Sequence, residues 1–222
     1  MYVELVSFTP EPEKLCALAA RICYTNKNWQ TLKQSITEKE IHNLLERIIS
    51  SGHLSVIEHA SFSFYIEGIS RVCSHQLVRH RLASFSQQSH RYSKPERFII
   101  PPPLKNEKTC LEILDKAQKT YNLLLKKGVK KEDARFILPQ AASTRIFLTM
   151  NARELLHFFR LRCCYRAQWE IRNVAMEMLK QVKRVAPFIF KSAGPPCLTG
   201  PCPEKEPCGI DITEIRNLFK DL

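Results

Sequence analysis

The sequence has no long apolar run, few glycines and a deficit of acidic residues. No stretch of about 18 apolar residues occurs, which argues against a membrane-spanning helix. The N-terminal segment MYVELVSFTPEPEK does not join a cationic start to an apolar segment, so we expect no signal peptide. Only six glycines are present, without a GxGxxG or GK[S/T] pattern, which argues against a Rossmann fold and a P-loop. Phosphate would therefore have to be bound by side chains.

The charge imbalance predicts anionic partners. The chain has 34 Lys and Arg against 22 Asp and Glu, a net charge of +12. Nucleic acid, a membrane surface and phosphorylated small molecules are the candidate classes. Lysines are mixed with acids on helix faces that we expect to be solvated, whereas arginines concentrate in Arg71 to Arg97 and Arg145 to Arg172. Because a guanidinium fork matches phosphate and carbonyl pairs, this clustering predicts a binding site.

Length and patterning favour one α+β domain with mixed helices around a central, largely antiparallel sheet. The chain has 222 residues, which suits one domain or one domain with a small appendage. Strands and helices do not alternate regularly, so a doubly wound sheet is disfavoured. The expected strands are 2–8, 60–66, 98–100 and 144–150; the expected helices are 12–23, 37–50, 69–80, 106–127, 131–136, 151–162 and 168–185. Thr37 with Glu40 forms a capping box, and Asn151 with Glu154 caps a later helix.

The segment RHRLASFSQQSHRYSK, residues 79–94, is expected to be a loop built for binding rather than for a core. Gln76 and Arg79 are three residues apart on the expected helix, so their side chains share a face. An amide beside a cationic fork suits a planar polar ring next to a phosphate. The alternative is an exposed helix end, where Arg79 complements the helix dipole.

His80 and Arg81 extend this cationic group. Three consecutive side chains point in different directions, which favours two anionic ligands meeting there over one. Hydroxyls and a further guanidinium follow at Ser86, Ser89 and Arg91. A plain polar loop remains the alternative.

A second set of arginines comprises Arg145, Arg162, Arg166 and Arg172. Arg172 adjoins Ile171 at the edge of an apolar stripe, so its side chain is placed to reach into a cleft. A guanidinium against the carbonyl edge of a pyrimidine would withdraw charge from the ring. The alternative for Arg172 is a salt bridge to an acid one turn away.

Histidines and cysteines give weaker signals. His53, Ser55, Glu58 and His59 lack the i, i+4 histidine pair of helical zinc sites, so we expect hydrogen bonding that positions a loop, and no metal. Nine cysteines without an export signal predict reduced thiols and a cytoplasmic protein. Cys163, beside Arg162, is a weak candidate for a thiol of lowered pKa. The thiols of Cys197, Cys202 and Cys208 lie in a Pro/Gly-rich tail without a C-x2-C pair, so zinc there is the minor alternative.

The sequence resembles the flavin-dependent thymidylate synthase family. Arg79-His80-Arg81 followed after seven residues by Ser89 matches the RHRx7S signature of that family. Further matching motifs occur in the same order: GHxSxxEHxxF at 52–62, Gln76, Arg91-Tyr92-Ser93, Leu138-Pro139, Ser143-Thr144-Arg145, Asn151-Ala152-Arg153 and AQWEIR at 167–172. The resemblance covers residues 1–190, and the Pro/Gly/Cys-rich tail 191–222 lies outside it.

The resemblance implies reductive methylation of dUMP to dTMP. Methylenetetrahydrofolate would donate the carbon, NADPH would reduce a bound FAD, and tetrahydrofolate would be released. The family fold implies a homotetramer whose active sites lie between subunits. A basic nucleic-acid-binding module is the alternative function, and a thiol or zinc protein built on the tail is a third.

The family's site residues transfer onto matching positions of this chain. Those implied for dUMP are Gln76, Leu77, Val78, Arg79, Gln87, Gln88, Ser89, His90, Arg91, Arg145 and Arg172. Those implied for FAD are Ser55, Arg79, His80, Arg81, Gln87, Arg162 and Arg166. Arg172 would polarise the uracil, and Ser89 would bind rather than attack, because a serine without an adjacent base is a poor nucleophile. Family members often have an acid where Gln87 stands and an Asn where Ser86 stands.

Overall fold

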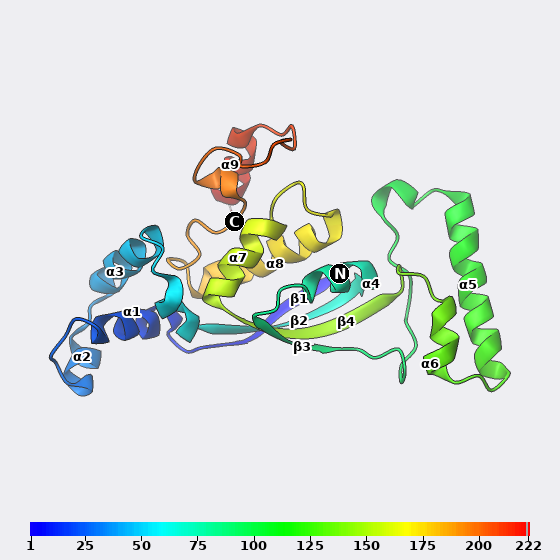
Figure 1. Cartoon of the computed structure of the whole chain (residues 1–222), viewed down its shortest axis with the longest axis horizontal. Helices are drawn as coiled ribbons and strands as arrows, with labels where there is room; N and C mark the ends of the chain where they lie inside the picture. The colour runs from blue at the N-terminus through cyan, green and yellow to red at the C-terminus, as the bar shows by residue number, and fades with distance from the viewer. Residues whose placement is uncertain (221) are drawn as a thin grey trace. The chain divides into compact units, whose positions relative to one another are not determined.

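The computed structural model describes residues 1–220 and 222 of the chain. Its four-stranded sheet has the order β1-β2-β4-β3 (Figure 1). The strands are β1 (Tyr2–Phe8), β2 (Ser61–Ser70), β3 (Ala83–Gln87) and β4 (Ser143–Asn151). Backbone hydrogen bonds join Ala152 to Ala60 at one end of the β2–β4 pair and Arg71 to Ala142 at the other, so these strands are antiparallel. The predicted α+β class with a largely antiparallel sheet is confirmed.

Strand β2 forms because its sequence alternates. Phe62, Phe64 and Ile66 are fully buried, while the residues between them are half-buried. This two-residue period is that of a strand with one covered face. Each of these side chains contributes about 1.5–3 kcal/mol by burial.

The chain forms two compact units. The first contains Met1–Tyr2, Ile66–Arg79 and Phe85–Phe147. The second contains Val3–Tyr65, His80–Ser84 and Leu148–Leu222.

The second unit begins with a group of short helices. They are α1 (Pro12–Ile22), α2 (Trp29–Ser35), α3 (Glu38–Ser50) and the 3-10 helix η1 (Leu54–His59). Thr37 accepts a hydrogen bond from the Glu40 backbone, and the Glu40 carboxylate accepts one from the Thr37 backbone at 2.9 Å, so the predicted capping box is confirmed. Helix α1 packs against both α3 and η1.

Helices α7 (Ala152–Arg162) and α8 (Trp169–Val185) pack against each other in the same unit (Figure 1). The Asn151 side chain accepts a hydrogen bond from the Glu154 backbone at 2.9 Å, which confirms the predicted cap of α7. Gln168 caps α8 in the same way. A short turn, residues 163–168, joins the two helices and carries Arg166.

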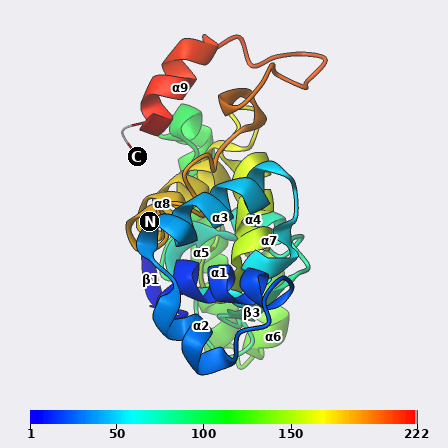
Figure 2. The same ribbon diagram turned by 90° about the vertical axis from the view of Figure 1, so that its left-hand side faces the viewer.

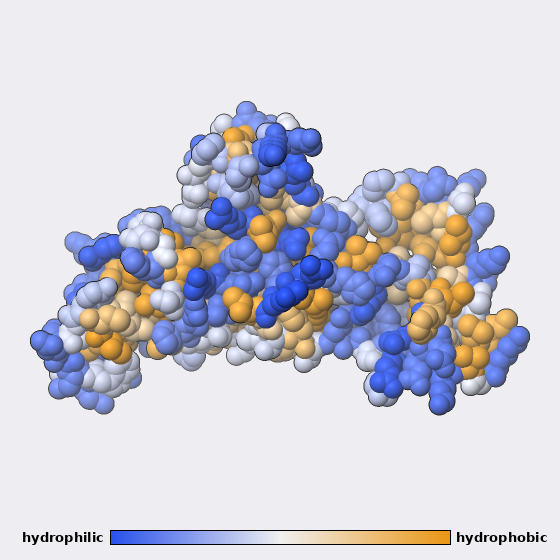
Figure 3. Space-filling model, in the orientation of Figure 1, coloured by the Kyte–Doolittle hydropathy of each residue, from blue (hydrophilic) through white to orange (hydrophobic). Residues whose placement is uncertain are grey.

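The first unit contains α4 (Arg71–Leu77), η2 (Pro102–Leu104), α5 (Lys108–Lys126), α6 (Lys131–Ala134) and η3 (Arg135–Ile137). Helix α5 packs against α6 and η3. Leu111, Ile113 and Leu123 on α5 and Phe136 in η3 are nevertheless exposed, and apolar side chains are visible on this part of the surface (Figure 3).

The C-terminal segment is folded. It contains η4 (Pro196–Leu198) and α9 (Ile212–Lys220), joined by a long loop (Figure 2). Ile215 and Phe219 of α9 are buried. Gly194 has a φ of +147°, and a β-carbon built on it would lie 2.8 Å from the Phe219 ring, so the backbone passes directly beneath α9.

Three sequence expectations need correction. The helix expected at 69–80 spans only Arg71–Leu77, so Arg79 follows the helix and does not share a helical face with Gln76. The expected loop at 79–94 contains strand β3, and the expected strand at 98–100 is a single bridge between Phe98 and Ala142. Helices α2 and α9 were not expected from the sequence.

Within residues 1–220 and 222, no helix combines the length and apolar content that crossing a bilayer requires.

Candidate active site

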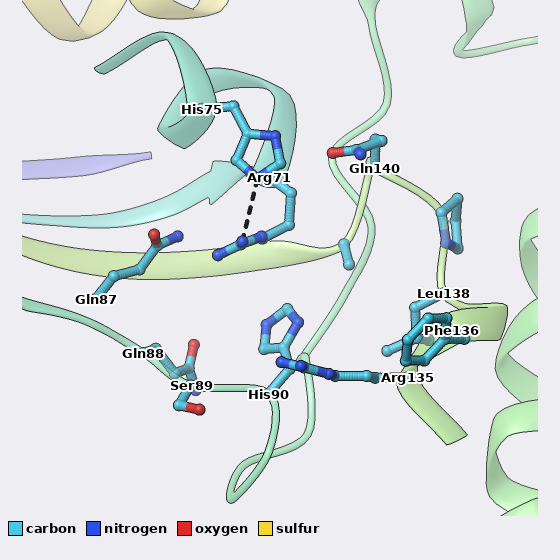
Figure 4. Close-up of a pocket in the computed structure, with 12 residues that line it drawn as sticks. Arg71, His75, Gln87, Gln88, Ser89, His90, Arg135, Phe136, Leu138 and Gln140 are labelled. Carbon is cyan, nitrogen blue, oxygen red and sulfur yellow. Dashed lines mark hydrogen bonds between the residues drawn. The ribbon is translucent and has the colours of Figure 1, made fainter. Parts of the chain in front are cut away.

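A cavity of about 530 Å³ in the first unit contains part of the predicted site. Its lining residues are Arg71, His75, Gln87, Gln88, Ser89, His90, Arg135, Phe136, Leu138, Pro139, Gln140 and Ala142. Four of them, Gln87 to His90, belong to the predicted dUMP set. The guanidinium groups of Arg71 and Arg135 enter from α4 and η3, opposite Gln87 and Ser89 (Figure 4). No acidic residue lines this cavity. The lining therefore suits an anionic, hydrogen-bonding ligand.

Gln87 is fixed at the end of β3. Its amide group donates hydrogen bonds to the hydroxyls of Ser74 at 2.9 Å and Thr144 at 3.2 Å. Because both amide hydrogens are used, its carbonyl oxygen remains to accept from a ligand. A carboxylate at this position would lack the two donors, so glutamine is accommodated by the hydroxyls of its own chain.

His90 is buried at the end of the same segment. Its Nε2 lies 3.2 Å from the Ser143 carbonyl, which only accepts, so Nε2 carries the proton. Burial lowers the pKa of His90, and the nearby guanidiniums of Arg71 and Arg135 lower it further, while the Ser143 carbonyl raises it. A neutral ring here leaves the arginines as the cavity's cations.

Three basic residues of the cavity, Arg71, His75 and Arg135, are not among the site residues predicted from the sequence. Arg71 donates to His75 Nε2 at 3.1 Å (Figure 4). Burial lowers the pKa of Arg71, and the neighbouring charge of Arg135 acts in the same direction. Two like charges facing one cavity mark a place where an anion would be stabilised. The arginine cluster beginning at Arg71 contained this signal, whereas Arg135 stood outside both clusters.

Other predicted substrate residues of this unit lie outside the cavity lining. Arg91 is exposed and pairs with the Glu132 carboxylate at 2.8 Å, and Arg145 pairs with Glu96 at 3.4 Å. The Gln76 amide donates to the Val72 carbonyl at 3.5 Å. Among the rest, Leu77 is buried, Val78 is exposed and Arg79 is exposed.

His80 of the signature is buried at the centre of a polar triad in the second unit. Its Nδ1 lies 3.0 Å from a Glu154 carboxylate oxygen, and its Nε2 lies 3.1 Å from Nε of Arg162. Since the guanidinium only donates, Nε2 accepts and Nδ1–H donates to Glu154. The imidazole is therefore neutral and holds Arg162 in one orientation. Phe158 packs edge-on against the ring, with centroids 4.9 Å apart.

The stability of the chain should fall in mild acid because the His80 imidazole is buried. Burial lowers the pKa of His80, against a smaller opposing effect of Glu154. Below about pH 6.5 the unfolded chain binds a proton there that the folded chain resists, so the free energy of unfolding decreases as the pH falls. Melting temperatures measured from about pH 7.5 to 5.5 should show this decline.

A matched pair of variants isolates the effect. H80N should reduce the pH dependence of the melting temperature, whereas H59Q, at an exposed position of η1, should preserve it. An unchanged pH dependence in H80N would contradict the assignment.

The remaining predicted flavin residues lie on the surface or in the α7–α8 turn. Ser55 and Arg81 are exposed. Arg166 contacts the Glu206 carbonyl and lies 3.6 Å from the Glu204 carboxylate. The guanidinium groups of Arg81 and Arg166 are exposed, while both ring nitrogens of His80 are occupied by Glu154 and Arg162.

Arg172 is half-buried on the first turn of α8. Its Nη1 donates to the carbonyls of Tyr165 at 2.9 Å and Ala167 at 3.5 Å. Its guanidinium carbon lies 4.7 Å from the centroid of the Tyr165 ring. The side chain is thus oriented by backbone carbonyls and an aromatic face, and the other edge of the fork remains available for a ligand.

The remaining candidates are the group of His53, Ser55, Glu58 and His59, and the cysteine Cys163. Glu58 pairs with Arg153 at 2.5 Å. In the part of the chain that the structure describes, no three His, Cys, Asp or Glu side chains are arranged to hold a metal in their present positions. Cys163, the weak candidate for a thiol of lowered pKa, does not have one, because burial raises the pKa of its thiol.

Comparison with known proteins assigns the family. The family model described as "Thymidylate synthase complementing protein" matches residues 4–188. The chain belongs to this family. It is 50% identical to the flavin-dependent thymidylate synthase of Geobacter sulfurreducens, over 100% of this chain and 99% of that relative.

Two further members of the thymidylate synthase complementing protein family show comparable similarity. The flavin-dependent thymidylate synthase of Clostridium tetani is 45% identical over 98% of this chain and 96% of that protein. The one from Sulfolobus acidocaldarius is 49% identical over 89% of this chain and 78% of that protein. The resemblance derived from the signature is thereby confirmed, and these matches give no support to the nucleic-acid-binding alternative.

Proposed function

We propose that this chain is a flavin-dependent thymidylate synthase, a methyltransferase that converts dUMP to dTMP. Methylenetetrahydrofolate donates the carbon, NADPH reduces FAD, and tetrahydrofolate leaves. The observation that carries the proposal is 50% identity over the whole chain to a relative of that name. The cavity also supports it, because residues 87–90 line a space with two guanidiniums and no acid.

The residues present fit FAD by the chemistry of their donors. Arg79 and Arg81 are exposed on either side of the buried His80, and Arg162 is held by His80. Guanidinium forks match the pyrophosphate oxygens of a dinucleotide bidentately. We assign phosphate and ring contacts to Arg79, Arg81, Arg162, Arg166 and Ser55. When bound, the flavin supplies hydride for the reduction.

For dUMP, the chain supplies polarisation and positioning. Arg172 places its guanidinium against the uracil carbonyl edge and stabilises the negative charge that develops there on attack. Gln87 accepts from the ring or sugar, and Ser89 donates to the nucleotide. Gln76, Gln88, His90, Arg91 and Arg145 complete the proposed nucleotide site; Arg91 and Arg145 would exchange Glu132 and Glu96 for phosphate.

We propose that the working form is a homotetramer with active sites between subunits. Exposed apolar side chains on the first unit support an interface with a second copy. Phe136 is 85% exposed and Ile113 is 61% exposed. Side chains of this kind in one region mark protein–protein contacts more often than open surface.

The function is tested by an anaerobic assay. Purified protein should be yellow, and dUMP with methylenetetrahydrofolate and NADPH should give dTMP and tetrahydrofolate. Omission of any one substrate should stop product formation. Colourless protein that binds no added FAD and forms no dTMP would refute the proposal.

Replacing Ser89 should weaken nucleotide binding without ending the chemistry. S89A loses one hydrogen bond of about 0.5–1.5 kcal/mol, so the Kd for dUMP should rise roughly 2- to 13-fold. S89C should keep substantial activity. Isothermal titration with dUMP measures the change, and S84A, at an exposed position of β3, is the control. Complete loss of turnover by S89A at saturating dUMP would instead favour a nucleophilic serine.

A further inference from the structure

The loop between η4 and α9 contains residues 201–210 and is fastened at both of its ends. Arg216 of α9 donates to the Cys197 carbonyl at 3.2 Å, so the turn before the loop is tied to the helix after it. The Lys183 ammonium of α8 donates to the Phe219 carbonyl at 3.0 Å, which ties α9 to the body of the second unit. The loop therefore starts and ends at fixed points, although it is long (Figure 2).

Residues 201–208, PCPEKEPC, form the part of this loop that we call the strap. A residue that precedes proline is biased away from the helical region, and the strap contains three prolines in eight residues. No residue of the strap lies in a helix or strand, and its two acidic residues, Glu204 and Glu206, are exposed. The strap is thus an acidic, non-helical segment in a chain whose net charge is +12.

The strap contacts Arg166 in the turn that joins α7 and α8. The Arg166 Nη1 donates to the Glu206 carbonyl, and the Arg166 Nε lies 3.6 Å from a Glu204 carboxylate oxygen. The guanidinium therefore contacts the strap through two of its nitrogens. The Arg166 and Glu204 side chains are 43% and 47% exposed, so the contact is open to solvent and to a competing ligand.

We propose that the strap is an autoinhibitory segment that occupies Arg166 in the flavin-free protein and is displaced by the pyrophosphate of FAD. The inference rests on the proposed function, because it takes Arg166 as one of the flavin contacts. A guanidinium binds phosphate oxygens through parallel N–H groups of its fork. The strap engages donors of the same guanidinium with a carboxylate and a carbonyl oxygen, so the strap and a phosphate compete for Arg166.

The strength of this contact suits reversible displacement. An ion pair between exposed side chains adds little to stability and is screened by salt. A pyrophosphate can instead accept charge-assisted, bidentate hydrogen bonds, which are stronger. Because the anchors at Arg216 and Lys183 involve other residues, the strap can leave Arg166 while α9 stays packed.

The two partners in this contact differ in their relation to the family. Arg166 lies within residues 4–188, which the family model matches, whereas the strap lies beyond them. The C-terminal segment therefore regulates access to a site in the shared part of the chain. The consequence is an apparent affinity for FAD lower than the site would have without the strap.

The first test measures FAD affinity in the full-length chain by quenching of flavin fluorescence, after bound flavin has been removed. E204Q removes the charge of the strap that faces Arg166, so the Kd for FAD should fall about 1.5- to 5-fold. E214Q removes the same charge from an exposed position of α9 and should leave the Kd unchanged. In an R166A background, E204Q should have no effect, because the strap then has no guanidinium to occupy.

The second test follows the strap by limited trypsin digestion, with cleavage after the exposed Lys205 detected by mass spectrometry. In wild-type protein, saturating FAD should raise the rate of cleavage after Lys205, because the displaced strap no longer contacts Arg166. E204Q should be cleaved faster than wild type without FAD, and FAD should accelerate its cleavage less. E214Q should respond to FAD as wild type does.

The outcomes separate this inference from the proposed function. Wild-type protein that binds no FAD contradicts the proposed function, and the strap proposal falls with it. Wild-type protein that binds FAD, with an equal Kd in E204Q, overturns the strap proposal alone. A decrease in Kd of the same size in the R166A background, or cleavage after Lys205 that FAD leaves unchanged or slows, overturns it as well.

Discussion

Arg172→Ala is expected to lower kcat for dTMP formation roughly 10²- to 10³-fold, the usual cost of removing one donor that stabilises developing charge. FAD should remain bound, because the proposed flavin contacts lie on other residues. Single-turnover measurement with dUMP and methylenetetrahydrofolate, alongside the visible flavin spectrum, separates the two effects. The guanidinium is pre-oriented by the Tyr165 and Ala167 carbonyls, so its loss should not be repaired by another side chain.

Two further variants serve as comparisons for Arg172→Ala. Arg172→Lys keeps the charge but not the fork, so it should recover only part of the rate. Arg184→Ala, at an exposed position in the last turn of the same helix, should leave kcat within about twofold of wild type. Turnover by Arg172→Ala within tenfold of wild type would rule out the polarising role.

Glu154→Leu is expected to destabilise the fold and loosen flavin binding together. The change leaves the buried Nδ1–H of His80 without its acceptor, at a cost of about 1–3 kcal/mol. For a chain of this length the melting temperature should fall by roughly 2–12 °C. His80 would then no longer orient Arg162, so the Kd for FAD should rise at least about fivefold.

Glu154→Gln provides the rescue, because its carbonyl oxygen still accepts from Nδ1–H. It should restore both the melting temperature and the FAD affinity to near wild type. Glu46→Leu removes an exposed carboxylate that pairs with Lys191 at 3.3 Å, a surface pair of small energetic value, and should change neither quantity. A drop in melting temperature for Glu154→Leu with unchanged FAD affinity would reduce Glu154 to a packing role.

Local signals in the sequence predicted the local structure well. The capping box of Thr37 and Glu40 and the cap of Asn151 act over three residues, and both are confirmed. Strand β3 was missed because its residues, ASFSQ, are mostly small or polar, although their exposure alternates in the structure. It forms by pairing with β4, a long-range interaction that no local pattern encodes.

The candidate site shows the same contrast between features that a local sequence pattern predicts and features that depend on long-range contacts. The family resemblance identified Gln87 to His90, and the structure places them on a cavity. The partner of His80 is Glu154, 74 residues away, and Arg162 comes from 82 residues away. Arg135 reaches the cavity from a 3-10 helix that follows a short surface helix. Such pairings depend on tertiary packing, so residue type and spacing alone could not predict them.

The crowding at Gly194 offers a way to disturb the packing of helix α9 selectively. A single methyl group there would collide with Leu198 and the Phe219 ring, and the backbone at φ +147° disfavours any other residue. Alanine at this position would displace α9 from its packing against residue 194 while every other side chain of the chain stays the same. The contribution of that helix to the stability of the chain could in this way be measured with a single substitution.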